Sequence, residues 1–261
     1  MRILDTRLGQ RLYFAYVLIL FLLPLPLVLV GYALTAFLPT VQRLRSIFRI
    51  NRWWVAFWEM FSGIHFQIHG KENLNPRQPY VLVSNHCNLL DVLLIGSCVQ
   101  HPWKALAKKE ILRVPVLGWM IATAAVVVDR SSPESRKRSL ASMSAQMQRG
   151  ISILVFPEGT RNRTPRPLKE FHTGAFHVAI EAQKPVLPMV MTGIRPLQPV
   201  ETLNFYPGTG HLHFLEPIPT EGLTQEDVPV LMALARERMY AALVEKEPQF
   251  RHLPAKEVIE A

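Results

Sequence analysis

Residues 80–98 read YVLVSNHCNLLDVLLIGSC, and this stretch decides the fold class. It begins with a short apolar run, continues through a polar loop and ends in a second apolar run. A short apolar run without alternation is typical of a strand that is buried on both faces, as strands of parallel sheets are. We therefore predict a strand over Tyr80–Ser84 and a helix over Asp91–Val99.

The same alternation of short β-rich runs and helical stretches continues to the C-terminus. It predicts an α/β fold with a mostly parallel mixed sheet flanked by helices on both faces. The Pro-rich stretch from Pro185 to Pro219 predicts irregular connections around edge strands. The other predicted strands are Ile64–His69, Ala124–Val128, Ser152–Phe156, Val186–Thr192 and His211–Phe214, and the other predicted helices are Lys109–Ala122, Pro133–Arg149, Gly174–Ala182 and Gln225–Val244.

The composition excludes several classes of protein. The chain has 261 residues, 49% of them hydrophobic, and a net charge of +9. This is too apolar for an intrinsically disordered chain, and two cysteines are too few for a disulfide scaffold. A chain that is both apolar and basic suits contact with an anionic membrane, whereas a nucleic-acid binder has no use for the apolar part.

The apolar residues are concentrated near the N-terminus. Tyr13–Pro39 is a run of 27 residues without a charge, which is long enough to cross a bilayer as a helix over about residues 13–38. Pro24 and Pro26 favour a kink, so a bent, half-inserted hairpin is the alternative. Basic residues flank the run on both sides and slightly favour a cytoplasmic C-terminal side: Arg2, Arg7 and Arg11 before it, and Arg43, Arg45, Arg49 and Arg52 after it.

A second N-terminal feature follows in Ser46–Phe66, which holds three of the five tryptophans beside Arg49 and Arg52. Trp and basic residues favour the headgroup layer, so we expect an interfacial helix over about residues 46–62. An ordinary amphipathic core helix is the alternative. The predicted organisation is a membrane-anchoring segment over residues 1–62 and an α/β domain over residues 63–261.

Polar clusters follow three of the predicted strands. They are Asn85-His86, Asp129-Arg130 and Pro157–Arg161. Ligands of open α/β sheets gather beyond the carboxyl ends of the strands, so these clusters predict the functional site.

The first cluster offers a histidine and a carboxylate. His86 and Asp91 are five residues apart, about 140° around a helix, and cannot share a helix face. With His86 in the loop and Asp91 in the first helical turn, the carboxylate can hold one ring nitrogen and leave the other free to act as a base. No GxSxG motif supplies an enzyme nucleophile, so the activated hydroxyl belongs to a substrate. A loop histidine and a capping aspartate are the alternative.

The third cluster, FPEGTR at 156–161, suits an anion and a hydroxyl group. Gly159 permits a tight turn, Arg161 offers a fork for phosphate, and Glu158 accepts hydrogen bonds from hydroxyls. A surface turn is the alternative. Metal ligation is not expected, because the pairs His65/His69 and His172/His177 lack a third ligand nearby.

Four sequence blocks together resemble the glycerolipid acyltransferase family, which includes the 1-acyl-glycerol-3-phosphate acyltransferases. The resemblance covers about residues 64–195, half of the chain. The blocks are NHCNLLD at 85–91, KKEILRVPVLGWMIATAAVVVDR at 108–130, FPEGTR at 156–161 and KPVLPMVMTG at 184–193.

The resemblance implies a membrane-bound O-acyltransferase that moves a fatty acyl group from acyl-CoA or acyl carrier protein to the free hydroxyl of lysophosphatidic acid. It implies no cofactor besides this co-substrate. His86, aligned by Asp91, would deprotonate the hydroxyl. The implied substrate-binding residues are Glu158, Gly159 and Thr160 beside the glycerol part, Arg161 on the phosphate, and Lys108, Lys109 and Arg130 as further phosphate ligands.

Other readings stay open at this point. The acceptor can instead be glycerol-3-phosphate or a lyso-ornithine-type lipid, and a non-catalytic lipid-binding membrane protein would use the same residues. A thiol mechanism through Cys87 is not expected, because nothing in the sequence lowers the pKa of that thiol. Since a thioester donor is made in the cytosol, we expect the domain to face the cytoplasm on an inner or equivalent membrane. Neither the donor carrier nor the oligomeric state follows from the sequence.

Overall fold

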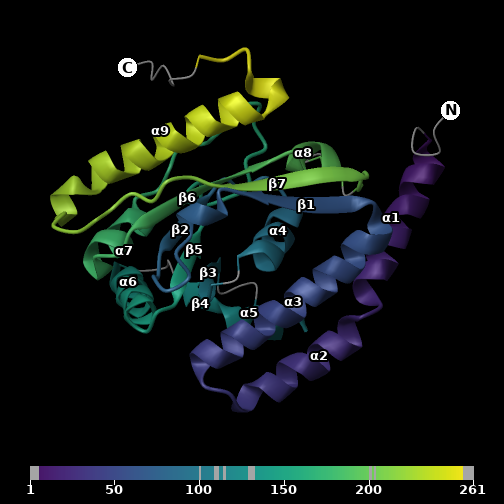
Figure 1. Cartoon of the computed structure of the whole chain (residues 1–261), viewed down its shortest axis with the longest axis horizontal. Helices are drawn as coiled ribbons and strands as arrows, with labels where there is room; N and C mark the ends of the chain where they lie inside the picture. Colours follow the sequence, from purple (N-terminus) through teal and green to yellow (C-terminus); the bar gives the residue numbers. More distant parts are fainter. Residues whose placement is uncertain are drawn as a thin grey trace.

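The computed structural model describes residues 6–99, 101–108, 112–113, 116–128, 133–199, 202 and 204–254. Its centre is a seven-stranded sheet in the order β1-β7-β6-β2-β5-β3-β4 (Figure 1). Neighbouring strands are parallel except for β6 and β7, which are antiparallel. The strands are β1 (Ile64–His69), β2 (Val81–Ser84), β3 (Trp103–Lys108), β4 (Ala125–Val128), β5 (Ser152–Val155), β6 (Val186–Thr192) and β7 (Gly208–Phe214).

Helices cover both faces of the sheet. In Figure 1, α9 lies on one side of the strands, and α3 and α4 lie on the other. The described α-helices are α1 (Arg7–Leu22), α2 (Leu25–Leu34), α3 (Thr40–Ser62), α4 (Leu90–Cys98), α5 (Leu117–Ala124), α6 (Pro133–Gln148), α7 (Gly174–Ala182), α8 (Ile194–Leu197) and α9 (Val228–Lys246). The α/β class and the mostly parallel mixed sheet are therefore confirmed.

Alternate residues of the central strands enter two separate cores. In β2, Val81 and Val83 pack into the core that α6, α7 and α9 cover. Leu82, between them, packs into the core that α1, α3 and α4 cover. Because successive side chains of a strand point to opposite faces, a strand with helices on both sides must be apolar throughout. This requirement explains the apolar runs that made β2 and β5 recognisable.

The structure corrects the predicted sheet in two places. The sequence analysis missed β3, which lies between β5 and β4 in the sheet. It also placed edge strands around the Pro-rich stretch, but β6 is an inner strand between β7 and β2. Pro188 still takes part in the sheet there: it pairs in register with Val83 of β2, and its carbonyl oxygen accepts the N–H of Leu215 (2.9 Å).

The N-terminal apolar run forms two helices rather than one helix over 13–38. α1 ends at Leu22 and α2 begins at Leu25, with Pro24 between them and Pro26 in the first turn, where a missing N–H costs no hydrogen bond. The break matches the kink expected from the prolines. Arg7–Phe37 taken together is long and apolar enough to cross a membrane, and 22% of its most apolar window is buried within the protein.

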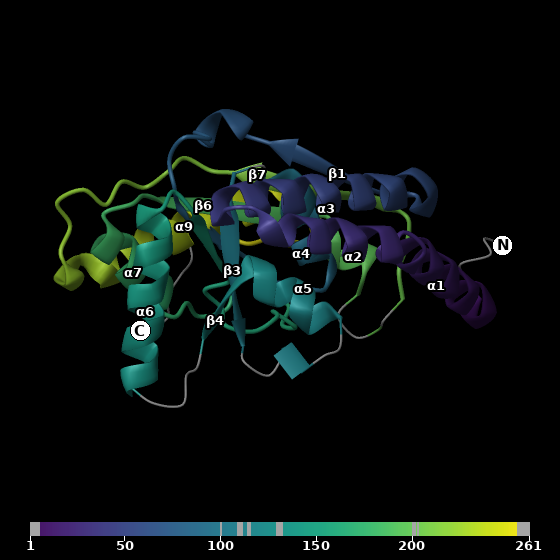
Figure 2. The ribbon, with the colours of Figure 1, turned by 90° about the horizontal axis from the view of Figure 1, so that it is seen from below.

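Helix α3 lies beside α1 and α2 (Figure 2). Its tryptophans divide into two groups. Trp54 and Trp58 are buried, and their indole N–H groups donate to the carbonyl oxygens of Phe21 (2.8 Å) and Val17 (3.0 Å) in α1. Only Trp53 is exposed, at 51%. Two of the three tryptophans thus fasten α1 to α3, and Trp53 alone of the three is left exposed; the interfacial position of this helix stays a prediction.

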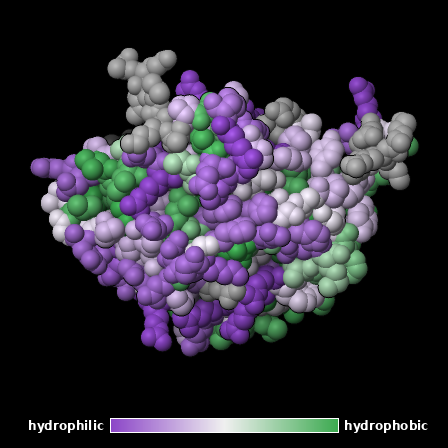
Figure 3. All heavy atoms as spheres, turned by 45° about the horizontal axis from the view of Figure 1, so that its top comes forward, coloured by the Kyte–Doolittle hydropathy of each residue, from purple (hydrophilic) through white to green (hydrophobic). Residues whose placement is uncertain are grey.

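Large apolar side chains remain exposed along α1 and α2. Figure 3 shows a mostly hydrophilic face on the α9 side, with hydrophobic atoms at the lower right edge, on the side of the N-terminal helices. Exposed apolar patches of this kind mark contact with a membrane or a partner. The exposed residues are Leu8, Leu12, Tyr16, Leu18, Ile19, Leu22, Leu23, Leu27, Val30, Leu34 and Phe37.

Candidate active site

His86 and Asp91 meet at the carboxyl end of β2. His86 lies in the loop that joins β2 to α4, and Asp91 lies in the first turn of α4, with none of its surface exposed. Nδ1 of His86 is 2.7 Å from Oδ2 of Asp91. The same oxygen accepts the backbone N–H groups of Cys87 (2.5 Å) and Asn88 (3.0 Å). One carboxylate oxygen therefore fixes both the loop and the imidazole ring.

The tautomer of His86 follows from this contact. An ionised carboxylate only accepts hydrogen bonds, so Nδ1 carries the proton and Nε2 keeps its lone pair. Nε2 makes no hydrogen bond with the described residues. The ring stacks on Phe156, with centroids 4.1 Å apart and planes at 17°, and its side chain is 19% exposed. The histidine is thus held rigidly, with its basic nitrogen available to a substrate.

Burial of the Asp91 carboxylate costs free energy of folding. Its second oxygen, Oδ1, is buried and has no hydrogen-bond partner among the described residues. Burying an unsatisfied polar group costs about 1–3 kcal/mol. An unsatisfied buried group calls for an explanation, and a catalytic role for the carboxylate is one.

The FPEGTR segment holds the backbone of His86 from the other side. The N–H of His86 donates to Oε1 of Glu158 (3.0 Å), and its carbonyl oxygen accepts the N–H of Asn162 (2.6 Å). Oε2 of Glu158 accepts the N–H of Lys169 (2.9 Å). Glu158 is only 2% exposed, and burial raises the pKa of its carboxyl group. Glu158 therefore lies behind His86 and holds its backbone, and it is not among the residues that line the cavity; its contact with the glycerol part of a substrate stays a prediction.

Gly159 has a steric reason to be glycine. Its φ is +71°, and a Cβ atom there would lie 2.8 Å from the ring of His172. Both observations favour a residue without a side chain at position 159. After this turn, Thr160 and Arg161 line the same cavity as His86.

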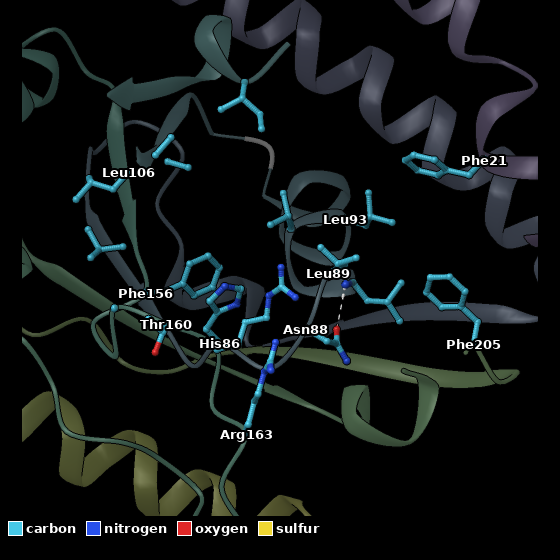
Figure 4. A pocket seen from close by; sticks show the side chains of 18 of the residues that line it. Phe21, His86, Asn88, Leu89, Leu93, Leu106, Phe156, Thr160, Arg163 and Phe205 are labelled. Atoms are coloured by element: carbon cyan, nitrogen blue, oxygen red, sulfur yellow. Dashed lines mark hydrogen bonds between the residues drawn. The ribbon is translucent and has the colours of Figure 1, made fainter. Parts of the chain in front are cut away.

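A cavity of about 1100 Å³ opens in front of His86 (Figure 4). Its polar end is lined by His86, Asn88, Thr160, Arg161 and Arg163. The rest of the wall is almost entirely apolar and comes from α1, α3, α4, α5, β3 and the loop before β7. These lining residues include Val17, Leu18, Phe21, Trp58, Leu89, Val92, Leu93, Leu106, Ile121 and Phe205. The cavity joins a basic, polar end to a long apolar wall.

The predicted site residues fall into three groups. His86, Gly159, Thr160 and Arg161 line the cavity. Asp91 and Glu158 lie behind it, each bonded to His86. Lys108 is the last residue of β3, and Lys109 and Arg130 lie outside the described residues, so the role of all three as phosphate ligands stays a prediction.

The sequence analysis missed the contribution of Asn162 and Arg163. Arg163 lines the same cavity as Arg161, and the buried Asn162 between them organises the loop. The i, i+2 spacing of the two arginines was the available signal, since it places both on one side of an extended segment. The apolar wall from α1 was also missed, and it carries no local sequence signal.

Cys87 is excluded as a nucleophile. Its side chain is 5% exposed, and burial together with the nearby Asp91 carboxylate raises the pKa of the thiol to about 12. A raised pKa disfavours the thiolate that a nucleophile needs, and this agrees with the sequence, in which nothing lowers the pKa of the thiol. Among the described residues, no three His, Cys, Asp or Glu side chains are grouped as a metal site.

Known proteins are similar to this chain in sequence and in fold. A family model described as Acyltransferase matches residues 65–192. An uncharacterised acyltransferase of Schizosaccharomyces pombe is 39% identical over 196 residues, which are 73% of this chain and 70% of that protein. Human 1-acyl-sn-glycerol-3-phosphate acyltransferase alpha is 36% identical over 184 residues, which are 68% of this chain and 63% of the human protein.

A solved structure shares the architecture. The crystal structure of the 1-acyl-sn-glycerophosphate (LPA) acyltransferase PlsC from Thermotoga maritima superposes with a TM-score of 0.73. The match covers 91% of this chain and 95% of that chain, at 23% sequence identity. The arrangement of sheet, helices and N-terminal segment is therefore common to both.

Proposed function

Because the chain belongs to the acyltransferase family that includes the 1-acyl-sn-glycerol-3-phosphate acyltransferases, and is thus an O-acyltransferase, we propose that it acylates lysophosphatidic acid. The fatty acyl group comes from a thioester of coenzyme A or acyl carrier protein. The product is phosphatidic acid, which feeds phospholipid synthesis. The observation that carries this proposal is the oriented His86–Asp91 pair facing a cavity that is basic at one end and apolar along its wall.

The proposed reaction needs one base and no covalent enzyme intermediate. Nε2 of His86 accepts the proton of the acceptor hydroxyl as that oxygen attacks the thioester carbonyl. Asp91 stabilises the imidazolium that forms. When the tetrahedral intermediate collapses, the carbon–sulfur bond breaks and the imidazolium returns its proton to the departing thiolate. The products are an ester and a free thiol, so atoms and charge balance.

The cavity supplies binding groups for both parts of a lysophospholipid. Arg161, at its polar end, is exposed and suits the phosphate, because a guanidinium donates two parallel hydrogen bonds to a phosphate. The apolar wall suits a fatty acyl chain. A volume of about 1100 Å³ slightly exceeds the usual range for small-molecule sites, which suits a long acyl chain.

The N-terminal helices support a location at a membrane. Val17, Leu18 and Phe21 of α1 line the cavity, while other side chains of the same helix are exposed and apolar. A lipid substrate could therefore pass between the bilayer and the cavity along α1 without crossing water. We propose that the catalytic domain lies on the cytoplasmic side, where thioester donors are made.

The test is to identify the lipid that the pure full-length chain makes. The protein in mixed micelles receives lysophosphatidic acid, glycerol-3-phosphate and a lyso-ornithine lipid together, with acyl-CoA or acyl carrier protein as donor. Mass spectrometry should find phosphatidic acid as the main product. A main product from another acceptor would replace lysophosphatidic acid in the proposal, and no acylated product with either donor would contradict it.

A further inference from the structure

We infer that Arg163 is a second phosphate ligand, and that with Arg161 it makes the site selective for acceptors with a phosphomonoester rather than a phosphodiester. This inference rests on the proposed function and extends it. Arg163 lines the same cavity as His86, and Figure 4 shows its side chain pointing toward the space that His86 and Asn88 border. No sequence block singled this residue out.

The two arginines are free to bind a ligand. Arg161 and Arg163 are both exposed, and neither guanidinium makes a hydrogen bond or an ion pair with the described residues. Two other cations near this loop, Arg195 and Lys169, are engaged. Arg195 donates to the carbonyl oxygens of Thr164 (2.8 Å) and Arg166 (3.3 Å), and Lys169 Nζ donates to the Thr160 hydroxyl (2.6 Å).

The charge around the cavity is of one sign. Among the described residues that line it, two are arginines and none is Asp or Glu. Two like charges on alternate residues of one loop repel each other, and no acidic side chain among the described lining residues offsets the repulsion. An anion of charge near −2 bound between them would do so.

The loop that carries Arg163 is built to hold it in place. Oδ1 of Asn162 accepts the backbone N–H of Thr164 (2.9 Å) and its hydroxyl (2.7 Å). The side-chain amide of Asn162 donates to the carbonyl oxygen of Arg166 (3.0 Å). With Arg195 bonded to the same loop, the backbone on both sides of Arg163 is fixed, so only the arginine side chain has to be ordered when a ligand binds.

Two guanidinium groups match a phosphomonoester better than a phosphodiester. A phosphomonoester near neutral pH carries a charge of about −1.5 to −2 and three terminal oxygens. A phosphodiester carries one negative charge and two non-bridging oxygens, which a single guanidinium fork can satisfy. Two forks therefore favour lysophosphatidic acid over lysophospholipids whose phosphate bears a second substituent.

The experiment compares two acceptors with four forms of the full-length chain. Lysophosphatidic acid and lysophosphatidylglycerol with the same acyl chain are supplied to the wild type, R163Q, R163K and R166Q, at saturating acyl donor. Arg166 is the matched control, because its exposed side chain lies on the same loop but does not line the cavity. Where lysophosphatidylglycerol is not turned over, its inhibition constant against lysophosphatidic acid replaces kcat/KM.

The expected result is a selective loss. R163Q should lower kcat/KM for lysophosphatidic acid about 10- to 100-fold, mainly through KM, with a much smaller effect on lysophosphatidylglycerol. R163K should fall between R163Q and the wild type, since it keeps the charge but not the fork. R166Q should match the wild type.

Two results would overturn the inference in different ways. Equal losses on both acceptors with R163Q, or no loss, would show that Arg163 does not recognise the second charge of the phosphate. A wild type that does not acylate lysophosphatidic acid would instead remove the proposed function on which the inference rests. Thermal unfolding of each variant, measured in parallel, separates a binding defect from a folding defect.

Discussion

Oδ2 of Asp91 is the point on which the loop after β2 converges: it lies 2.7 Å from Nδ1 of His86 and accepts two backbone N–H groups besides. The carboxylate thus has two roles. It orients the imidazole, and it holds the loop in the conformation that presents that imidazole to the cavity.

Replacing this carboxylate by an amide should separate the two roles. In Asp91→Asn the amide oxygen can still accept from the backbone, but no negative charge stabilises the imidazolium. We expect kcat to fall about 10²- to 10⁴-fold with little change in KM for the acceptor. Rates of phosphatidic acid formation check this, and a kcat within a few fold of the wild type would show that the carboxylate is only a helix cap.

The buried carboxyl group of Glu158 should make stability depend on pH. Burial raises the pKa of Glu158 above its ordinary value of 4.5. A group with a raised pKa in the folded state stabilises the fold in its protonated form. Its contribution is fully present below pH 4.5 and is lost as the pH rises through the raised pKa.

Glu158→Gln removes this titration. The wild type should therefore lose stability relative to Glu158→Gln as the pH rises from about 4.5 toward neutrality. Urea unfolding of both proteins in the same detergent, across this pH range, measures the difference. A difference that does not change with pH would contradict the assigned burial of the carboxyl group.

Both cysteines should resist alkylation in the native protein. Burial raises the pKa of Cys87 to about 12 and that of Cys98 to about 11, so both are protonated thiols at pH 8. Iodoacetamide should label neither residue in the folded chain and both after unfolding, as counted by intact mass. Rapid labelling of the native protein with parallel loss of activity would reopen a thiol mechanism.

Substitutions of two α3 tryptophans should affect different properties of the protein, membrane binding for Trp53 and stability for Trp58. Trp53 is exposed, whereas Trp58 is 1% exposed and bonded to α1. Trp53→Ala should weaken binding to anionic vesicles and leave the unfolding midpoint near that of the wild type. Trp58→Phe should lower the midpoint, because it loses a buried hydrogen bond of about 0.5–1.5 kcal/mol. Equal vesicle binding by Trp53→Ala and the wild type would exclude α3 from the membrane contact.

Local features of the sequence predicted much of the fold. Strands β2 and β5 are apolar throughout because helices cover both of their faces, so they could be recognised without knowing their neighbours. Strand β3, Trp103–Lys108, has the sequence WKALAK and offers no such run. It is a strand because β5 and β4 lie on either side of it, which is a property of the sheet rather than of the six residues.

In the site, too, contacts between residues close in the chain could be predicted, whereas contacts between distant residues could not. His86 and Asp91 could be paired in advance because the distance between them is set by one short loop and one helical turn. The contact of Glu158 with His86 could not be predicted, since this hydrogen bond joins residues 72 positions apart in the chain. The wall formed by Leu18 and Phe21 depends on how α1 folds back across the domain, and no local pattern encodes that.

The most direct test of the central claim compares the wild type with His86→Ala, supplied with lysophosphatidic acid and an acyl thioester, by following phosphatidic acid over time. The account predicts that the substitution slows product formation about 10²- to 10⁴-fold while the protein stays folded. A folded His86→Ala variant that forms phosphatidic acid at close to the wild-type rate would contradict the claim that this imidazole removes the proton of the acceptor.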